Sequence, residues 1–535
     1  MNEEYCLLYK PWIKVLNYEN VIKEVSLLDV FKNAHQYKRL SGETVTQDAA
    51  IYRLLLSIVI TVFYRYDSDG QKEDVLDCLD PVEIILERWF SYWERGSFDA
   101  EAFQKYLETY RERFYLFHPQ TPFWQVANLK EGTNYGIINL YGNIKESNNK
   151  ASRHHFHVTD GKYVENISYA EAARWLVYNN AYSINVKTKV DGKSKATGVG
   201  WLGQLGLIMV KGDSLYKSLL LNLCPLDNNG NAWAEPKPIW EQEPRVDPGI
   251  EIPPADNLPE LYTLQSRRLL LLRNDDKIEE YRSIGGDYYS STDNLVEPMT
   301  LLKRDENEDP KPQRHKKEVA GWREFPSLLV SRGQENLKPG LLRWLETLKE
   351  LHFDAGDIVT FQMVGLEYGD GMSYTNGELI NNYLSMSKEL IKEKGEEWRT
   401  LITNEIANCE KVAQNSFYVF AKTLVFEMFP GNDDKIKNAN VKNLKDKLSS
   451  AYYYKIDQSF REWLISIEPG KSIQEKKEWE WQEISARIAN DVVFEYVSGM
   501  APQYTMACAR AFGLFKSVLC RIYSKGKKDG REKRE

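Results

Sequence analysis

The stretch QDAAIYRLLLSIVITVFYRY (residues 47–66) is apolar on nearly every side of a helix, which predicts a helix buried in the core of a globular domain. Its most apolar run, Leu54–Phe63, lies between Arg53 and Arg65 and is too short to span a bilayer. We therefore expect a core helix and no membrane anchor.

The chain has 535 residues, and at about three to four times the common domain size this length predicts one large domain and a smaller one. With 42% hydrophobic and 28% charged residues, it belongs to the ordinary globular class. Its 32 tyrosines and 14 tryptophans suit surfaces that meet a partner or stack on a base.

Four long segments with helical periodicity fill the C-terminal region and are joined by short links, which is typical of an up-down bundle. These segments are Trp398–Phe429, Val441–Ile467, Ile473–Val497 and Pro502–Tyr523. Helices and strands are mixed before them, so the expected fold class is α+β. We expect a large mixed α/β N-terminal domain at residues 1–376, a four-helix bundle at 377–524 and a disordered basic tail at 525–535.

The overall charge is −8, from 70 Lys and Arg against 78 Asp and Glu, so any contact with nucleic acid must be local. Six widely spaced cysteines form no C-x-x-C pair, which argues against a zinc clamp and indicates reduced thiols in the cytoplasm. The opening MNEEYCLLYK carries acids where a secretory signal carries bases, and it has no long apolar run.

The segment GVGWLG (residues 198–203) fits the G-x-G-x-x-G pattern of dinucleotide sites, but its context does not. A lysine-rich loop precedes the glycines and a strand-like LIMV follows, whereas that site needs a strand before and a helix after. The three histidines in RHHFH (residues 153–157) have no cysteine or carboxylate at ligand spacing. We therefore expect no cofactor, no metal site and no enzymatic activity.

The same region is a candidate for binding duplex DNA. The stretch Asn185–Gly203 is polar and glycine-rich, and we expect it to be a long loop. Its lysines are Lys187, Lys189, Lys193 and Lys195, with Asp191 as the only acid. Glycines let the backbone approach a groove closely while ammonium groups neutralise phosphates. The alternative on composition alone is a solvated surface loop.

Several segments, taken together in their order along the chain, resemble a known family. They are YKPWIKV near the start, FHPQTPFWQV (117–126), SYAEAARWLV (168–177), the glycine loop leading into VKGDSLYKSLLLNL, QSRRLLLL (265–272) and VGLEYGDGMS (364–373). This series is similar to the CasA family, the large subunits of the type I-E CRISPR surveillance complex Cascade. The resemblance covers about the first 380 residues and is compatible with the helical remainder.

This resemblance implies a non-enzymatic subunit with an α/β N-terminal domain and a C-terminal four-helix bundle. Its implied partners are the other Cascade subunits, the crRNA 5′ handle, double-stranded target DNA and a helicase-nuclease. The family reads the protospacer-adjacent motif in duplex DNA, mainly from the minor groove, and starts strand separation and R-loop formation. It then recruits the helicase-nuclease.

By position, the family's glycine loop falls near Asp191–Gly200, so the resemblance assigns groove and phosphate contacts to Gly192, Lys193 and Lys195, with Lys187 and Lys189 beside them. Phe156 falls where the family places an aromatic residue against the crRNA handle, and an unpaired base could stack on its ring.

Two positions depart from the family pattern. The family's wedge glutamine falls at Gly371 or Met372, so Met372 is the candidate wedge and Tyr374 a second one. The family's groove-entering lysine falls near Asp287, where IGGDYYSST has no lysine. The nearest basic substitutes are Lys277 and Arg282.

Two other functions stay open. The chain could be a scaffold subunit that assembles with RNA-guided partners and reads no DNA, which the two departures favour. It could also be a nucleotide-dependent enzyme that uses the GVGWLG loop, and binding of NAD or ATP to the isolated chain would distinguish this function.

Overall fold

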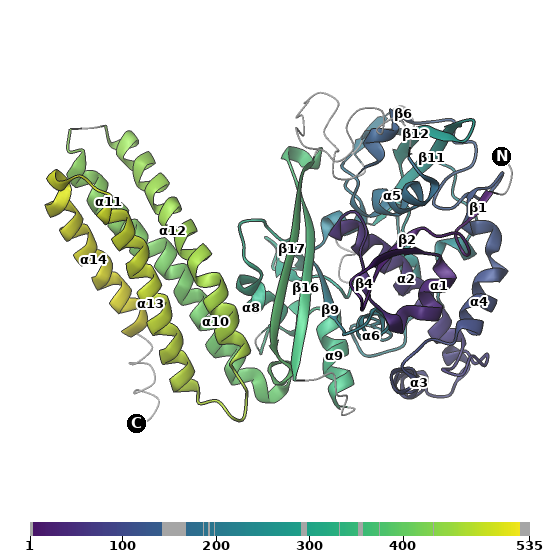
Figure 1. The fold of residues 1–535 in the computed structure, drawn as a ribbon, viewed down its shortest axis with the longest axis horizontal. Coiled ribbons are helices and arrows are strands. Elements are labelled where there is room, and N and C mark those ends of the chain that lie inside the picture. The colour runs from purple at the N-terminus through teal and green to yellow at the C-terminus, as the bar shows by residue number, and fades with distance from the viewer. Residues whose placement is uncertain are drawn as a thin grey trace. The chain divides into compact units, whose positions relative to one another are not determined.

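The computed structural model describes residues 4–141, 167–185, 187–190, 193–196, 198–289, 297–330, 332–350, 357–373, 375–431 and 433–524 (Figure 1). The chain divides into two compact units. The first comprises Met1–Val319, Asn336–Ala355 and Thr360–Tyr383, and the second comprises Ala320–Glu335, Gly356–Val359 and Leu384–Glu535. The expected basic tail, 525–535, lies outside the described residues.

The centre of the first unit is helix α2 (Val45–Arg65). Thr44 caps its start, because the side-chain oxygen accepts a hydrogen bond from the backbone N–H of Gln47 at 3.1 Å. By length and composition alone α2 could cross a membrane, which corrects our estimate from its most apolar run. In the fold, however, 89% of its most apolar window is buried, so the prediction of a core helix is confirmed.

The main charged group inside this core is paired, although Arg53 Nε has no hydrogen-bond partner among the described residues. The guanidinium of Arg53, in the middle of α2, makes two hydrogen bonds of 2.6 Å to the carboxylate of Glu297. The indole N–H of Trp201 donates to the same carboxylate at 3.0 Å, and the ring of Tyr262 lies 3.5 Å from the guanidinium carbon. The bidentate pairing with Glu297 means that neither charge is buried without a partner of opposite charge.

Seven other helices complete the described helical part of the first unit. They are α1 (Leu27–Asn33), α3 (Pro81–Arg95), α4 (Ala100–Thr109), α5 (Tyr169–Tyr182), α6 (Leu215–Leu221), α7 (Leu258–Tyr262) and α9 (Gly340–Glu350). Helices α4, α5, α6 and α7 all contact α2. Ser168 caps α5 by accepting from the backbone N–H of Glu171 at 3.2 Å, which confirms the start predicted for this helix.

The strands of the first unit form several small sheets around these helices. The described pairings are β1 (Glu4–Cys6) with β5 (Tyr115–Phe117); β3 (Ile22–Val25), β2 (Ile13–Asn17) and β4 (Tyr37–Leu40); β11 (Arg267–Asn274), β12 (Lys277–Gly285) and β6 (Thr133–Gly136); β10 (Glu251–Ile252) with β13 (Tyr288–Tyr289); and β14 (Leu302–Arg304) with β15 (Pro310–Pro312). Strands β7 (Lys187–Val190) and β8 (Lys193–Ala196) form a separate two-stranded ribbon.

One further sheet has the order β17-β16-β9 and carries the longest strands. Strand β16 (Ile358–Tyr368) pairs antiparallel with β9 (Leu207–Lys211), and a short turn leads from β16 into β17 (Thr375–Ser387). The sequence predicted helices directly after that turn, but a long strand follows instead. Residue 376, where the sequence placed a domain boundary, lies within β17.

The second unit is dominated by long helices that lie along one another (Figure 1). They are α10 (Glu396–Lys411), α11 (Phe417–Met428), α12 (Asp434–Ile465), α13 (Gln474–Ser498) and α14 (Thr505–Ser524); the short α8 (Phe325–Leu328) also belongs to this unit. A π-helical turn, Val412–Ser416, joins α10 and α11 into one rod, so the bundle has the four rods that the sequence predicted. The expected α+β fold class is confirmed.

The interior of the bundle explains how the π turn is tolerated. Such a turn leaves backbone carbonyls without their usual helical donors. The hydroxyl of Ser449 on α12 donates to the carbonyl of Ala413 in the turn at 2.9 Å. Aromatic rings surround this contact, with Phe417 stacked against Phe515 at a centroid distance of 5.7 Å. The turn is therefore fixed by a neighbouring helix.

Candidate nucleic-acid interface

The lysine-rich stretch is a β-hairpin, and the expectation of a long structureless loop was wrong. Strands β7 and β8 pair antiparallel, with Thr188 opposite Lys195 and Val190 opposite Lys193. Because alternate residues of a strand belong to opposite faces, positions 193 and 195 fall on one face of this ribbon and positions 187 and 189 on the other. Gly192 lies outside the described residues. We call this ribbon the lysine hairpin.

Both ends of the lysine hairpin are held by one buried arginine. Arg267, at the start of β11, donates from Nη2 to the carbonyl oxygen of Ile184 at 2.6 Å and to that of Gly198 at 2.7 Å. These two carbonyls lie on either side of the hairpin in the chain. Burial lowers the pKa of Arg267 to about 10, because the charged form is desolvated. The base of the hairpin is thereby fixed to a core strand.

Asn185, two residues before the lysine hairpin, contacts the turn between β16 and β17, where the sequence placed the wedge. The backbone N–H of Asn185 donates to the carbonyl of Met372 at 2.8 Å, and its side-chain amide donates to the carbonyl of Gly371 at 3.3 Å. The Asn185 side-chain oxygen accepts from the backbone N–H of Gly198 at 3.1 Å. Two segments that are far apart in the sequence, both predicted to contact DNA, therefore meet.

The turn itself has an unusual backbone. Gly371 and Met372 both have positive φ, at 61° and 56°, and the left-handed region is costly for a residue such as methionine. Gly371 is exposed and Met372 is partly exposed. Arg314 donates from Nη2 to the Met372 sulfur, and burial lowers the pKa of this arginine. Tyr374, the second wedge candidate, lies outside the described residues.

Two of the three glycines of GVGWLG, Gly200 and Gly203, serve close packing in this fold. A Cβ on Gly200 would lie 2.5 Å from the backbone carbonyl of Ala181, and a Cβ on Gly203 would lie 2.2 Å from the hydroxyl oxygen of Tyr368. That hydroxyl donates to the carbonyl of Tyr182 at 2.8 Å. A 3₁₀ turn and strand β9 follow these glycines, so the strand-then-helix arrangement of a dinucleotide site is absent from this described segment.

An acidic residue, Asp287, lies near the position where the family's groove-entering lysine falls. Asp287 is buried and bridges two arginines, accepting from Arg268 at 2.8 Å and from Arg245 at 2.9 Å. Of the two substitutes, Arg282 donates to the side chain of Asn134 and to the carbonyl of Leu129, both at 2.7 Å. Lys277, at the start of β12, is exposed. Only Lys277 therefore keeps an uncommitted charged group.

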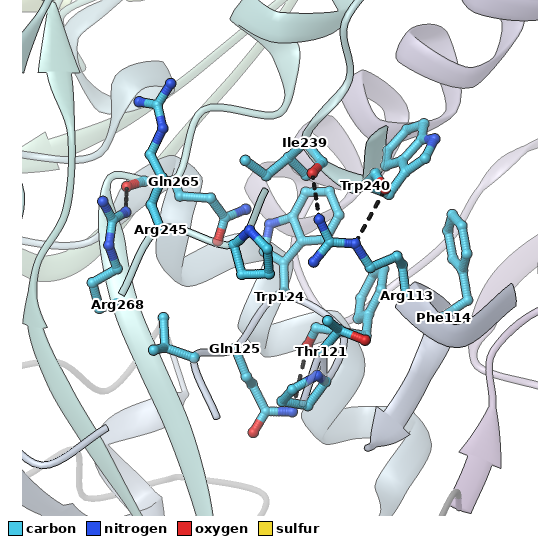
Figure 2. A pocket seen from close by; sticks show the side chains of 14 residues that line it. Arg113, Phe114, Thr121, Trp124, Gln125, Ile239, Trp240, Arg245, Gln265 and Arg268 are labelled. Carbon is cyan, nitrogen blue, oxygen red and sulfur yellow. Dashed lines mark hydrogen bonds between the residues drawn. The ribbon is translucent and has the colours of Figure 1, made fainter. Parts of the chain in front are cut away.

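Arg245 and Arg268 line a small pocket with Arg113, Trp124 and Trp240 (Figure 2). Figure 2 shows the Arg113 guanidinium directed at the backbone oxygens of Ile239 and Trp240, with donor–acceptor distances of 3.3 and 3.1 Å. The enclosed volume is about 60 Å³, which has room for a few waters and none for a base. We therefore assign these arginines to holding the loops together.

The remaining predicted site residue is not covered by these observations. Phe156 and the histidines of RHHFH lie in 142–166, outside the described residues. Among the residues that are described, no group of three or more His, Cys, Asp or Glu side chains could hold a metal ion.

Comparisons with known proteins agree with this fold. The family model of CRISPR-associated protein Cse1 matches residues 7–492. The CasA/Cse1 protein of Thermus thermophilus is 27% identical over 336 residues, which is 62% of this chain and only 61% of that relative's length.

Two solved structures have the same fold. Cse1 of Thermobifida fusca superposes with a TM-score of 0.80 at 24% identity, covering 97% of this chain and 98% of that one. A chain of a CRISPR RNA-guided surveillance complex superposes with a TM-score of 0.69 at 16% identity, covering 96% and 99%.

Proposed function

The chain belongs to the CRISPR-associated Cse1 family, and on that premise we propose that it reads the protospacer-adjacent motif in duplex DNA for a type I-E, crRNA-guided antiviral surveillance complex. It is the large subunit of that CRISPR complex, as CasA/Cse1 proteins are in Cascade. In this role it helps to separate the DNA strands and recruits the helicase-nuclease. It does so as a binding subunit, without a catalytic step of its own.

The observation that carries the proposal is the contact between Asn185, two residues before the lysine hairpin, and the β16–β17 turn. Asn185 makes two hydrogen bonds to the carbonyls of Gly371 and Met372, at 3.3 and 2.8 Å. Reading a motif and opening the adjacent base pair require two elements that reach neighbouring positions on the duplex. The hydrogen bonds of Asn185 to the turn hold the two elements close together in the protein.

The chemistry of the two elements is complementary. Lysines supply the phosphate contacts that position a protein on DNA, and the minor groove presents a degenerate pattern that one backbone segment can accept in several related motifs. An apolar side chain such as Met372 can enter a base step and unstack it, at a cost of a few kcal/mol. Pairing of the opened strand with crRNA then offsets this cost.

The other partners follow from the family. We propose that the crRNA 5′ handle is bound through an aromatic contact at Phe156, and that the protein works in the cytoplasm beside the other Cascade subunits. A scaffold subunit that reads no DNA is the second candidate. It is favoured by Asp287, which stands where the family has its groove lysine and whose carboxylate is committed to Arg245 and Arg268.

The test uses the assembled complex with Lys193→Glu and Lys195→Glu combined. We expect weaker binding to target duplex at fixed salt, with unchanged complex assembly in gel filtration. The matched control is Lys303→Glu, at an exposed position of β14. Undiminished duplex affinity in the double variant would contradict DNA reading by this hairpin and favour the scaffold role.

A further inference from the structure

A separate cavity of about 280 Å³ lies between the first turns of α2 and the sheet β17-β16-β9. Asp48 of α2, Arg39 of β4, Lys211 of β9, Gln362 of β16 and Asn381 of β17 all line it. Its volume is close to the range of small-molecule sites, roughly 300–1,000 Å³. Neither the lysine hairpin nor the β16–β17 turn contributes a residue to it.

Lys211 and Asp48 both line this cavity, and the described residues include no salt bridge between them. Lys211 has no salt-bridge or hydrogen-bond partner among the described residues. Asp48 accepts one hydrogen bond, from the backbone N–H of Gly42 at 2.7 Å, through one of its two oxygens. Burial raises the pKa of Asp48 to about 7 and lowers the pKa of Lys211. Both side chains are partly buried, and a partly buried charge without a partner is costly, so a ligand that pairs with the Lys211 ammonium would gain free energy on binding.

The cavity favours an anion. Arg39 and Lys211 supply two cations, and the carboxyl group of Asp48 is the only acidic one among the lining residues. Because burial favours the neutral form of that carboxyl, the cavity carries a net positive charge near neutral pH. Guanidinium and ammonium groups together are typical ligands of a phosphate.

A pair of carboxamides supplies the second recognition element. The side-chain amide of Gln362 donates to the side-chain oxygen of Asn381 at 2.8 Å. This bond leaves the Gln362 oxygen as an acceptor and the Asn381 nitrogen as a donor. Carboxamides that present a donor beside an acceptor pair with the edges of nucleobases, and the second oxygen of the Asp48 carboxyl group is also available to a base edge.

We propose that this cavity is a nucleotide-binding site, with the phosphate held by Lys211 and Arg39 and the base edge facing Asp48 and the Gln362–Asn381 pair. The nucleotide has two sources with the same chemistry, a free mononucleotide or one unstacked nucleotide of a bound strand. The site goes beyond the proposed reading of duplex DNA, and it stands or fails independently of the lysine hairpin.

The experiment is calorimetric titration of the full chain with AMP, GMP, CMP and UMP. We expect saturable binding of at least one of them, weakened about tenfold or more in Lys211→Met and largely retained in Lys211→Arg. The matched control is Lys303→Met, which removes an exposed lysine charge and should bind as the wild type does. Because Lys211→Met removes a partly buried charge that has no described partner, the variant should keep or raise the thermal midpoint, which reports that it is folded.

Competition separates the two sources. A single-stranded oligonucleotide that displaces the bound mononucleotide indicates a strand nucleotide, and failure to displace it indicates a free one; both support the site. The proposal is overturned if none of the four nucleotides saturates, if Lys211→Met binds as tightly as wild type, or if inorganic phosphate binds as well as every nucleotide. Duplex affinity of the Lys211→Met complex should be unchanged, which distinguishes this site from the hairpin.

Discussion

Removing the lysine charges of the hairpin one strand at a time tests how the ribbon meets DNA. The pairing of Thr188 with Lys195 and of Val190 with Lys193 divides the four lysine positions between the two faces. Two paired variants therefore probe the two faces separately. They are Lys193→Gln with Lys195→Gln, and Lys187→Gln with Lys189→Gln.

The expected magnitude follows from counterion release. Each phosphate that a lysine neutralises contributes about 0.9 to the slope of log K against log salt concentration for duplex DNA. Two lysines on one face therefore account for a slope change of about 1.8. A hairpin inserted into a groove meets phosphates on both walls, so each pair should lower the slope by about 1.8 and the quadruple variant by about 3.6. A hairpin lying flat on the backbone responds to one pair only.

The assay is fluorescence anisotropy of the assembled complex with a motif-bearing duplex over a series of salt concentrations. Lys303→Gln removes a lysine charge elsewhere in the first unit and should leave the slope unchanged. Gel filtration checks that each variant still assembles. If neither pair alters the slope, the lysine hairpin does not contact the phosphates and the reasoning fails.

Three further outcomes are expected. Met372→Gly removes the proposed wedge side chain, and glycine tolerates the positive φ of this position. R-loop opening, followed by 2-aminopurine fluorescence, should slow by about tenfold, which corresponds to about 1.4 kcal/mol in activation free energy, while duplex affinity stays unchanged. Equal opening rates would exclude a wedge at this residue. Gly203→Ala places a Cβ 2.2 Å from the Tyr368 hydroxyl oxygen. The variant should therefore have a free energy of unfolding lower by about 1–3 kcal/mol in urea titrations. An unchanged urea midpoint would show that the Tyr368 side chain moves away without cost. Burial raises the pKa of Glu405 in α10 from 4.5 to about 7. Between these two pH values the folded state holds a proton that the unfolded state releases. The free energy of unfolding should therefore fall as pH rises from about 4.5 to 7 and stay low above that. Glu405→Gln should remove this fall and stabilise the protein at pH 8 by about 3 kcal/mol in chemical denaturation, and an identical pH dependence in both proteins would contradict the assignment.

Local patterns were enough to predict the helical parts of the fold. The continuous apolar surface of residues 47–66 indicated a core helix, and α2 is one. The periodicity of Trp398–Phe429 indicated one long helix, and the structure has α10 and α11 continuous through a π turn. Helical periodicity is set by neighbours within a few residues, so it is visible in a single sequence.

The lysine hairpin could not be predicted in the same way. Its strands contain lysine, serine and threonine and lack the alternation of apolar and polar residues that marks a half-buried strand. Its position depends on contacts with residues distant in the sequence, from Arg267 to the carbonyls of Ile184 and Gly198 and from Asn185 to Met372. No local signal carries such contacts.

The role of Asp287 was also beyond the sequence. Alignment by position showed that a lysine is missing there, but not what the aspartate does. In the fold it joins Arg245, before β10, to Arg268, on β11, and it is buried with the second of them. Arg245 and Arg268 therefore hold loops together through their ion pairs with Asp287, and a sequence alone does not distinguish such arginines from ones that bind DNA.

Arg267 anchors the chain at both ends of the lysine hairpin through backbone carbonyls, so this anchoring does not depend on the side chains of the hairpin. Arg267 binds the carbonyls of Ile184 and Gly198, so the chain is fixed to the core strand β11 just before and just after the lysine hairpin. Exchanges of side chains at strand positions 187–190 and 193–196 alter the chemistry of the hairpin and leave both hydrogen bonds of Arg267 in place, because those bonds are made to backbone carbonyls outside the strands. Under the proposed function, such exchanges would change which DNA motif is bound while these two anchoring hydrogen bonds stay in place.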